Sequence, residues 1–476
     1  MADGGSRILS GPVRLEVLRF GLPLSFGMGI QTAFNLVDAY VISKLDAGVA
    51  GPALGAIGIC DQLAALGTIV SYGISVASAT LLSRRAGAKD DQGVKRVAFQ
   101  SMLIVAALSA LIGAAGAFGA GFLIHDVVGA KGRVAELAVP YLRAMLGGSF
   151  TIFFLLHLTS VQRALGSSKT PIALLLLSNL LNFLLAVVLV YGPGRAPPVF
   201  AWAPAIARAC HAPRLGLMGA AWATLLARAI VLVPLVAILV ARFDLFPKAV
   251  RKVESRLIRE ILHLGWPSSA QLVLRLLAML LTHSVVARAF TTAQDQSATT
   301  ALGIVFRLET MALFVGLGWG GAAQTFVGQN LGANKRARAK LSGWYASLYN
   351  ALMMGALAAG YIIWGRPLVA LFDSDPAVVT PALSYLHWVG LSYVGLGIGV
   401  VLGSAVQGAG NTLRAFLLDA AVVLGLQLPA SLLVLAASHA SYVAIWQVVA
   451  LTYVAFALVH VANYRWGRFL GVARGH

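Results

Sequence analysis

The chain has 476 residues, of which 59% are hydrophobic and only 11% are charged, and its formal net charge is +19. A soluble domain carries about a quarter charged residues, so this composition excludes a compact globule in water. A lipid bilayer accommodates such a chain because helices satisfy their own backbone hydrogen bonds there. The two cysteines, Cys60 and Cys210, imply no disulfide framework.

Apolar segments follow one another along the chain after a polar start. Residues 1–19 contain no short apolar core with a cleavage site, so we expect no cleaved signal peptide. Each membrane span needs about 20 apolar residues. The sequence therefore predicts transmembrane helices over 17–43, 52–84, 93–125, 136–165, 170–193, 214–243, 258–290, 298–330, 338–367, 378–407, 411–437 and 440–466. These spans predict an all-α membrane protein of about twelve transmembrane helices, with no room for a soluble catalytic domain.

Lysine and arginine are unevenly divided between the two sides that these spans define. With the N-terminus inside, the inner segments hold 24 of the 36 basic residues and the opposite loops hold eight. Basic residues gather on the cytoplasmic side of membrane proteins. We therefore expect a multi-pass protein of the plasma (inner) membrane with both termini cytoplasmic. The expected partners are the lipid bilayer and a small-molecule substrate, not nucleic acid, and the longest outer loop, 192–213, is expected to lie on the surface.

Short stretches of the first half recur in the second half at a nearly constant offset. The matching pairs begin at residues 20 and 264, 53 and 301, 87 and 332, 141 and 385, and 161 and 406, so the offset is 244 to 248. Because six spans is an even number, both halves enter the membrane from the same side. The repeat predicts two pseudo-symmetric six-helix bundles, 1–245 and 246–476. Transporters built from such repeats place the substrate site between their halves.

Four motifs resemble those of one transporter family. The most specific is VGQNLGA at 327–333, and the others are Asn35-Leu36-Val37-Asp38, GSSKTP at 166–171 and AGNT at 409–412. In order along essentially the whole chain, they resemble the multidrug and toxic compound extrusion (MATE) family. The resemblance implies two six-helix bundles that form a V. It also implies export of drug-like, amphipathic and often cationic compounds by proton or sodium antiport. We expect no enzyme activity and no cofactor.

Asp38 is the first candidate for ion coupling. Gln31, Asn35 and Asp38 are spaced i, i+4 and i+7, so they form one polar stripe on a helix. A buried carboxylate can load and unload a proton, and ionisable residues within spans are functional candidates. Proton-linked members of the resembled family, especially its DNA-damage-inducible branch, use an aspartate at this place in the motif. A structural carboxylate hydrogen-bonded to neighbouring helices is the alternative.

The fifth span adds the amides Asn179 and Asn182. Asn182 matches the leucine–asparagine element of the resembled family, and either a hydrogen bond to Asp38 or a role in helix association is open. Some family members carry an aspartate four residues later, where this chain has Ala186. The resemblance therefore puts a two-carboxylate site in the first bundle in doubt.

The second bundle departs further from the family. Sodium-linked members carry a glutamate eight residues after the proline that matches Pro267, and this chain has Arg275 there. We therefore predict proton rather than sodium antiport. Arg275 is expected to pair with Glu309, to face the cavity or to reach the membrane interface. Asp61 and Glu309 share the 248 offset, so each half is expected to place one acid on its second helix. The candidates for the substrate cavity are Gln31, Asn179, Asp61, Arg275 and Glu309.

Two other functions stay open. Four arginines within spans would suit an anionic headgroup, so a flippase for a lipid-linked saccharide or other anionic lipid, from the same wider superfamily, is the alternative. They are Arg143, Arg228, Arg275 and Arg307, and their position inside or outside the central cavity separates the two functions. A membrane enzyme needs clustered catalytic residues, and the sequence has none, nor a metal-ligand spacing or an ATPase motif. We expect a monomer, and Asp419, early in the eleventh span, is expected to face water and is assigned no role.

Overall fold

The structure is a computed structural model that describes residues 3–245, 252–292, 294–437 and 441–466, apart from the side chains of 3–6, 32–39 and 47. Within these residues every regular element is a helix. The first half contains α1 (Asp3–Ser10), α2 (Val13–Ser43), α3 (Ala47–Gly87), α4 (Asp91–Phe122), α5 (Gly132–Gly147), α6 (Ser149–Ala164), α7 (Lys169–Tyr191), α8 (Ala203–Ala209) and α9 (Leu217–Phe243). The second half contains α10 (Ser255–Ala289), α11 (Ser297–Gly332), α12 (Arg336–Ile363), α13 (Gly365–Ala370), α14 (Pro376–Val389), α15 (Tyr393–Gly408), α16 (Thr412–Val422), α17 (Leu428–Ala436) and α18 (Tyr442–Trp466).

The number of spans agrees with the sequence. Ten of the described helical segments are long and apolar enough to cross a membrane, and the pair α5 and α6, bent by 42°, makes an eleventh. Helix α2 has 31 residues, and it completes the predicted twelve. The predicted ends lie within five residues of the observed ones. The chain is therefore an all-α, multi-pass integral membrane protein, as predicted.

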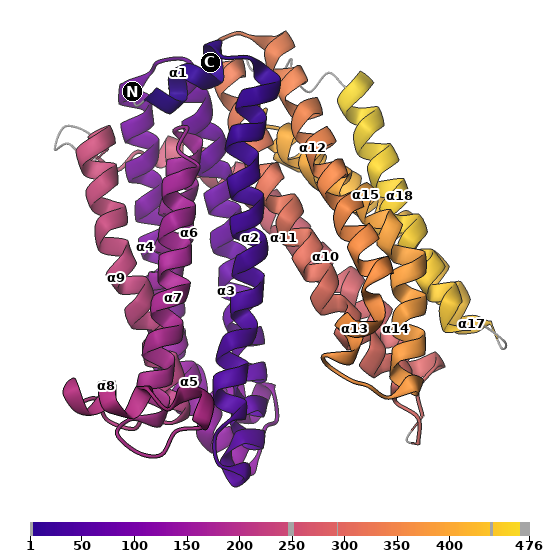
Figure 1. The fold of residues 1–476 in the computed structure, drawn as a ribbon. Coiled ribbons are helices and arrows are strands. Elements are labelled where there is room, and N and C mark those ends of the chain that lie inside the picture. Colours follow the sequence, from indigo (N-terminus) through magenta and orange to yellow (C-terminus); the bar gives the residue numbers. More distant parts are fainter. Residues whose placement is uncertain (1–2, 246–251, 293, 438–440, 467–476) are drawn as a thin grey trace.

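The two bundles meet at one end of the molecule and diverge toward the other (Figure 1). We call the end that carries α1 the α1 face, and the opposite end, which carries α8, the α8 face. Near the α1 face, Val17 and Phe20 of α2 belong to the same hydrophobic core as Phe326 of α11. Leu257 and Ile261 of α10 likewise belong to a core of the first bundle. Near the α8 face, the first bundle has a separate core built only from its own helices.

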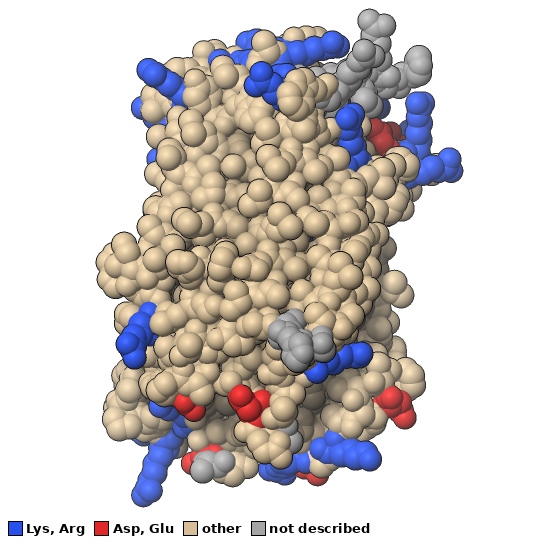
Figure 2. All heavy atoms as spheres, turned by 90° about the vertical axis from the view of Figure 1, so that its right-hand side faces the viewer, with Lys and Arg blue, Asp and Glu red and all other residues tan. Residues whose placement is uncertain are grey.

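The charged side chains occupy the two ends of the molecule. Figure 2 shows lysine, arginine, aspartate and glutamate at the top and bottom of one face, with a broad band almost free of charge between them. Large apolar side chains in the helices are exposed in this structure, among them Leu111, Phe118, Leu280, Leu352 and Leu458. Exposed apolar area of this extent is expected of a surface that contacts lipid rather than water.

Matching residues of the two halves make matching contacts at the junction. Ser25 of α2 donates a hydrogen bond to the carbonyl of Val315 at 2.9 Å. Its counterpart Ser269 of α10 donates to the carbonyls of Ile69 at 3.1 Å and Val70 at 3.5 Å in α3. The members of each pair stand 244 or 245 residues apart. The first span therefore packs as the pseudo-symmetric mate of the seventh.

Helices α3 and α11 cross at the α1 face with almost no side chain between them. A Cβ on Gly87 would overlap the backbone of Gln329, and a Cβ on Gly332 would overlap that of Arg84. Gly328 lies directly on Ser83, its own counterpart, so this pair marks the pseudo-two-fold axis. Only glycine permits such an approach of two backbones. The proposed boundary between the halves, at 245, stays a prediction, because the following residues 246–251 lie outside the described ones.

The outer loop 192–213 is more ordered than expected from its sequence. It contains the 3-10 turn Pro198–Phe200 and the short helix α8. Phe200 is 2% exposed and packs on the rings of Tyr191 and Phe183. The segment is therefore not purely a surface loop, because its buried Phe200 packs into the core at the α8 end of the first bundle.

Candidate transport site

A polar cavity lies between the bundles, close to where they meet. Its volume is about 90 Å³, which is far below the roughly 300 Å³ at which drug-sized pockets begin. The first bundle contributes α2, α3, α6 and α7, and the second contributes α11 and α15. The polar residues of the lining are Gln31, Tyr72, Ser75, Thr159, Ser160, Arg163, Gln324, Ser404 and Gln407.

The wall of this cavity ties the two bundles together. The side-chain amide of Gln324 in α11 donates to the carbonyl of Val76 at 2.9 Å and to the hydroxyl of Thr80 at 3.0 Å, both in α3. Thr80 in turn donates to the carbonyl of Gln407 in α15 at 3.0 Å. These bonds cross the junction, so a motion that separates the bundles here must break them.

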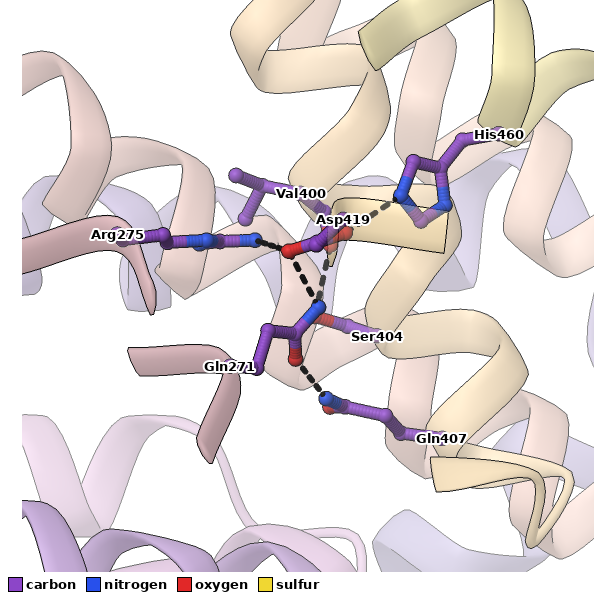
Figure 3. Close-up of polar contacts among 7 residues, drawn as sticks. All are labelled: Gln271, Arg275, Val400, Ser404, Gln407, Asp419 and His460. Atoms are coloured by element: carbon purple, nitrogen blue, oxygen red, sulfur yellow. Dashed lines mark hydrogen bonds and ion pairs between the residues drawn. The ribbon is translucent and has the colours of Figure 1, made fainter. Parts of the chain in front are cut away.

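Gln407 connects this cavity to a buried ionic cluster in the second bundle (Figure 3). Its amide nitrogen donates to Gln271 of α10 at 2.6 Å, and the amide nitrogen of Gln271 donates to the carboxylate of Asp419 at 2.7 Å. All three residues are buried. The side chain of Gln271 therefore links Gln407 in the cavity wall to Asp419, so a rearrangement at Gln407 would also affect Asp419.

Asp419 is the centre of that cluster. Arg275 pairs with its Oδ2 at 3.1 Å, and Nε2 of His460 in α18 lies 2.8 Å from its Oδ1. Its side chain is only 1% exposed, so its charge depends on these partners because water is excluded. The expectation that Asp419 faces water is wrong. Arg275 pairs with Asp419 rather than with Glu309.

Glu309 occupies a second polar site in the same bundle. The hydroxyl of Tyr385 in α14 donates to Oε2 at 2.5 Å, and the hydroxyl of Tyr453 in α18 donates to Oε1. Glu309 and Arg275 both line a pocket of about 130 Å³ that lies inside the second bundle. Two phenol donors stabilise a carboxylate in an apolar surrounding. Glu309 therefore belongs to the second bundle's interior, not to the cavity between the bundles.

The candidates of the first bundle lie in several places. Gln31 lines the cavity between the bundles. Asn182 accepts a hydrogen bond from the hydroxyl of Thr224 in α9 at 3.0 Å, and the amide nitrogen of Asn179 is buried without a hydrogen-bond partner. The side chains of Asn35 and Asp38 lie outside the described residues. Their predicted contact with Asn182 therefore stays a prediction.

Asp61 and Glu309 are not equivalent positions. Helices α3 and α11 are each continuous, and at their α1 ends the matching residues stand 245 apart. An offset of 248 would need an insertion of one helical turn, and neither helix contains one. The residue that matches Asp61 is Phe306, and Asp61 is exposed whereas Glu309 is enclosed by two tyrosines. The two halves therefore do not carry a symmetric pair of acids on their second helices.

Of the four span arginines considered above, none lines the cavity between the bundles. Arg275 lines the inner pocket of the second bundle, and Arg307 lies over the ring of Phe372 with its charge 5.6 Å from the centroid. The arginine that does line the cavity is Arg163. Arg163 lies near the end of the fourth span, so the sequence alone groups it with the basic residues of the cytoplasmic loop and does not identify it as a cavity residue.

The sequence carries a signal for Asp419 and His460. Each is an ionisable residue inside an apolar span, and such residues are functional candidates by default. Contacts between them and α10 cannot be read from the sequence in the same way, because Gln271 and Arg275 each lie more than a hundred residues from Asp419 along the chain. The cluster forms through the packing of α10, α16 and α18 against one another.

Two similar helical bundles, joined at one face around a polar cavity, define a multi-pass membrane protein with the architecture of a transporter. The MatE family model matches residues 23–188 and 267–433, one copy in each half, and the chain therefore belongs to the MATE family. This is a family of transporters, and the chain is not an enzyme.

Individual relatives cover most of the chain. The probable multidrug resistance protein YpnP of Bacillus subtilis is 26% identical over 86% of this chain and 85% of its own length. The FAD transporter of Shewanella oneidensis is 24% identical over 89% and 88%. A transporter of the MOP superfamily from Pyrococcus furiosus, described as having a binding pocket of reverse polarity, superposes with a TM-score of 0.85 at 20% identity and covers both chains completely. That last likeness establishes the fold alone.

Proposed function

We propose that the chain is a secondary active exporter of small amphipathic organic compounds that works as a monomer in the plasma (inner) membrane, by proton antiport and alternating access. The observation that carries the proposal is the junction itself. The bundles share cores and backbone contacts at the α1 face, and the first bundle has a core of its own at the α8 face. Such bundles can rock about a cavity at their junction.

The basic residues support a direction of export. Among the described residues, most lysines and arginines lie in segments at the α1 face, which makes this face cytoplasmic in the proposed topology. The form described here is then closed to the cytoplasm. Relatives named for multidrug resistance support drug-like cargo, whereas the relative named for FAD transport widens the range of cargo charge.

Arg275 in the second bundle supports proton coupling rather than sodium coupling. Arg275 stands where sodium-linked members of the family carry an acid, and its guanidinium is paired with Asp419. A fixed cation at this point repels Na⁺ and occupies the carboxylate that a sodium ion would need. Asp38 in α2 remains the proposed proton carrier in the first bundle.

Transport in proteoliposomes tests the proposal. Purified protein is reconstituted, and uptake of the fluorescent dye tetramethylrhodamine methyl ester is followed under a proton gradient or a sodium gradient, each at zero membrane potential. We expect the proton gradient alone to drive uphill transport. Uphill transport driven by sodium at clamped pH would refute proton coupling, and no gradient-driven transport of any amphipathic dye would refute the exporter itself.

A further inference from the structure

Arg163 lines the central cavity and has no part in the proposed proton coupling. It lies one residue before the end of α6 and is partly buried. Its guanidinium lies across the junction from α11, where Nε stands 3.8 Å from the position of a Cβ on Gly321. A Cβ there would make an ordinary van der Waals contact, so Arg163 lies beside the α11 backbone at Gly321.

The positive charge of Arg163 has no negative partner among the described residues. No carboxylate in that part of the chain lies within 4 Å of its guanidinium, whereas the partly buried Arg275 is paired with Asp419. Every other polar residue described in the cavity lining is a neutral amide, phenol or hydroxyl. Withdrawing an arginine from water without a counter-ion is costly, so such a residue inside a membrane protein marks a place where a ligand supplies the charge.

The surroundings of Arg163 suit an oxyanion. Tyr72 lines the same cavity and carries a hydroxyl group that can donate to it. The hydroxyls of Thr159 and Ser160 also line it, and in this structure they donate to the carbonyls of Leu156 at 3.0 Å and Ser75 at 3.3 Å. A volume of about 90 Å³ is too small for a whole drug molecule but holds one carboxylate, sulfonate or phosphate group. A guanidinium binds each of these groups with two parallel hydrogen bonds.

We propose that Arg163 binds an anionic group of the cargo, so that this exporter accepts organic anions that carry a carboxylate, sulfonate or phosphate. The inference rests on the proposed export function and specifies its cargo. It differs from the cationic cargo that the family resemblance implies. The anionic group enters the cavity while the apolar remainder of the cargo lies between the diverging bundles.

Two dyes with the same xanthene core separate the two charges. Fluorescein is an anion at neutral pH, and tetramethylrhodamine methyl ester is a cation. Binding of each to the purified full-length protein in detergent is measured by fluorescence anisotropy for the wild type, Arg163→Gln, Arg163→Lys and the control Arg143→Gln. Arg143 is an exposed span arginine that does not line the cavity, so its variant removes the same charge elsewhere.

We expect Arg163→Gln to weaken fluorescein binding at least about tenfold, because a charge-assisted hydrogen bond is lost. Arg163→Lys keeps part of the affinity, Arg143→Gln binds like the wild type, and the rhodamine binds no more weakly in any variant. Melting temperatures show whether each variant is folded. If Arg163→Gln does not fold, the Arg163→Lys variant provides the test. We expect this variant to bind fluorescein more weakly than the wild type. Its remaining affinity should fall as the salt concentration rises, because the lysine keeps the positive charge.

Equal fluorescein affinity in the wild type and the Arg163 variants would overturn the inference. So would a wild type that binds the rhodamine and not fluorescein. Either result leaves the exporter intact if a proton gradient drives transport of the rhodamine in proteoliposomes. Conversely, Arg163-dependent binding of fluorescein without gradient-driven transport of either dye would leave the anion site standing and refute the export function.

Discussion

Asp419 shows how much one carboxylate depends on its neighbours inside a membrane protein. Gln271 and Arg275 approach it from α10 and His460 approaches it from α18, so the residue joins three helices. A buried ion pair adds little stability compared with apolar packing. Loss of one partner is costly, however, because it leaves the other charge buried and unpaired. The cluster therefore fixes the relative positions of α10, α16 and α18.

Replacement of Arg275 should reveal this dependence. We expect Arg275→Gln to destabilise the protein by about 3 kcal/mol, because Asp419 loses its cationic partner while staying buried. Thermal unfolding in detergent measures the effect. Arg307→Gln is the matched control, since Arg307 is an exposed arginine of the neighbouring helix α11. Equal melting temperatures for the two variants would show that the pair with Asp419 is unimportant for stability.

Asp38 offers the corresponding test of coupling. We expect Asp38→Asn to abolish coupled export while insertion and folding are retained, because the amide has nearly the same shape but cannot load and release a proton. Drug efflux is measured in cells that lack other pumps, together with the protein level in the membrane and the melting temperature. Wild-type efflux at a normal protein level would refute the assignment, and Glu309, Asp61 and Asp419 would then be examined next.

At the scale of helices, we expect the crossing of α3 and α11 to control closure of the α1 face. A Cβ on Gly332 meets the backbone of Arg84, and a backbone cannot move aside without moving its whole helix. We expect Gly332→Ala to push the two helices apart, to open the α1 face and to slow export. Gly303→Ala is the control, because Gly303 is on the same helix and a Cβ there meets no atom within 4 Å.

Thiol labelling measures that opening. Thr80 is buried at the junction, so a cysteine introduced as Thr80→Cys in a Cys210→Ser background should react slowly with a maleimide. The native Cys60 is also buried. We expect Gly332→Ala to raise the labelling rate and Gly303→Ala to leave it unchanged. Equal rates in both variants would mean that the glycine contact does not hold the face closed.

The helices themselves could be predicted well from the sequence, because long apolar runs have few alternatives in a bilayer and polar segments separate them. Contacts between helices could not. The apparent offset of 248 paired Asp61 with Glu309, yet two continuous helices keep the offset of 245 throughout. Arg163 resembles a loop charge in the sequence because it lies at the end of a span, and its position along the chain does not show that its side chain lines the cavity.

At the scale of the whole molecule, the pseudo-two-fold axis explains why the junction lies at one face. The counterpart glycines Gly87 and Gly332 let the second helices of the two bundles approach closely there. The first helices of the two bundles pack across the axis with matching serine hydrogen bonds. For this junction to open by rotation of one rigid bundle against the other, the hydrogen bonds of Gln324 and Thr80 across it must break.

Distances between spin labels in lipid nanodiscs test this rocking most directly. One pair of labels, at Lys131 and Ser374, spans the bundles at the α8 face, and a second pair, at Gln92 and Arg336, spans them at the α1 face. A third pair, at Lys131 and Arg208, lies within the first bundle. All these residues are exposed.

We predict that acidification or added cargo populates a form in which the α8 pair is closer and the α1 pair is farther apart, while the pair within the first bundle keeps its distance. Opposite changes at the two faces are the signature of alternating access by rigid bundles. Distances that stay the same at both faces under conditions of active transport, or a change within the first bundle as large as that between the bundles, would contradict the account.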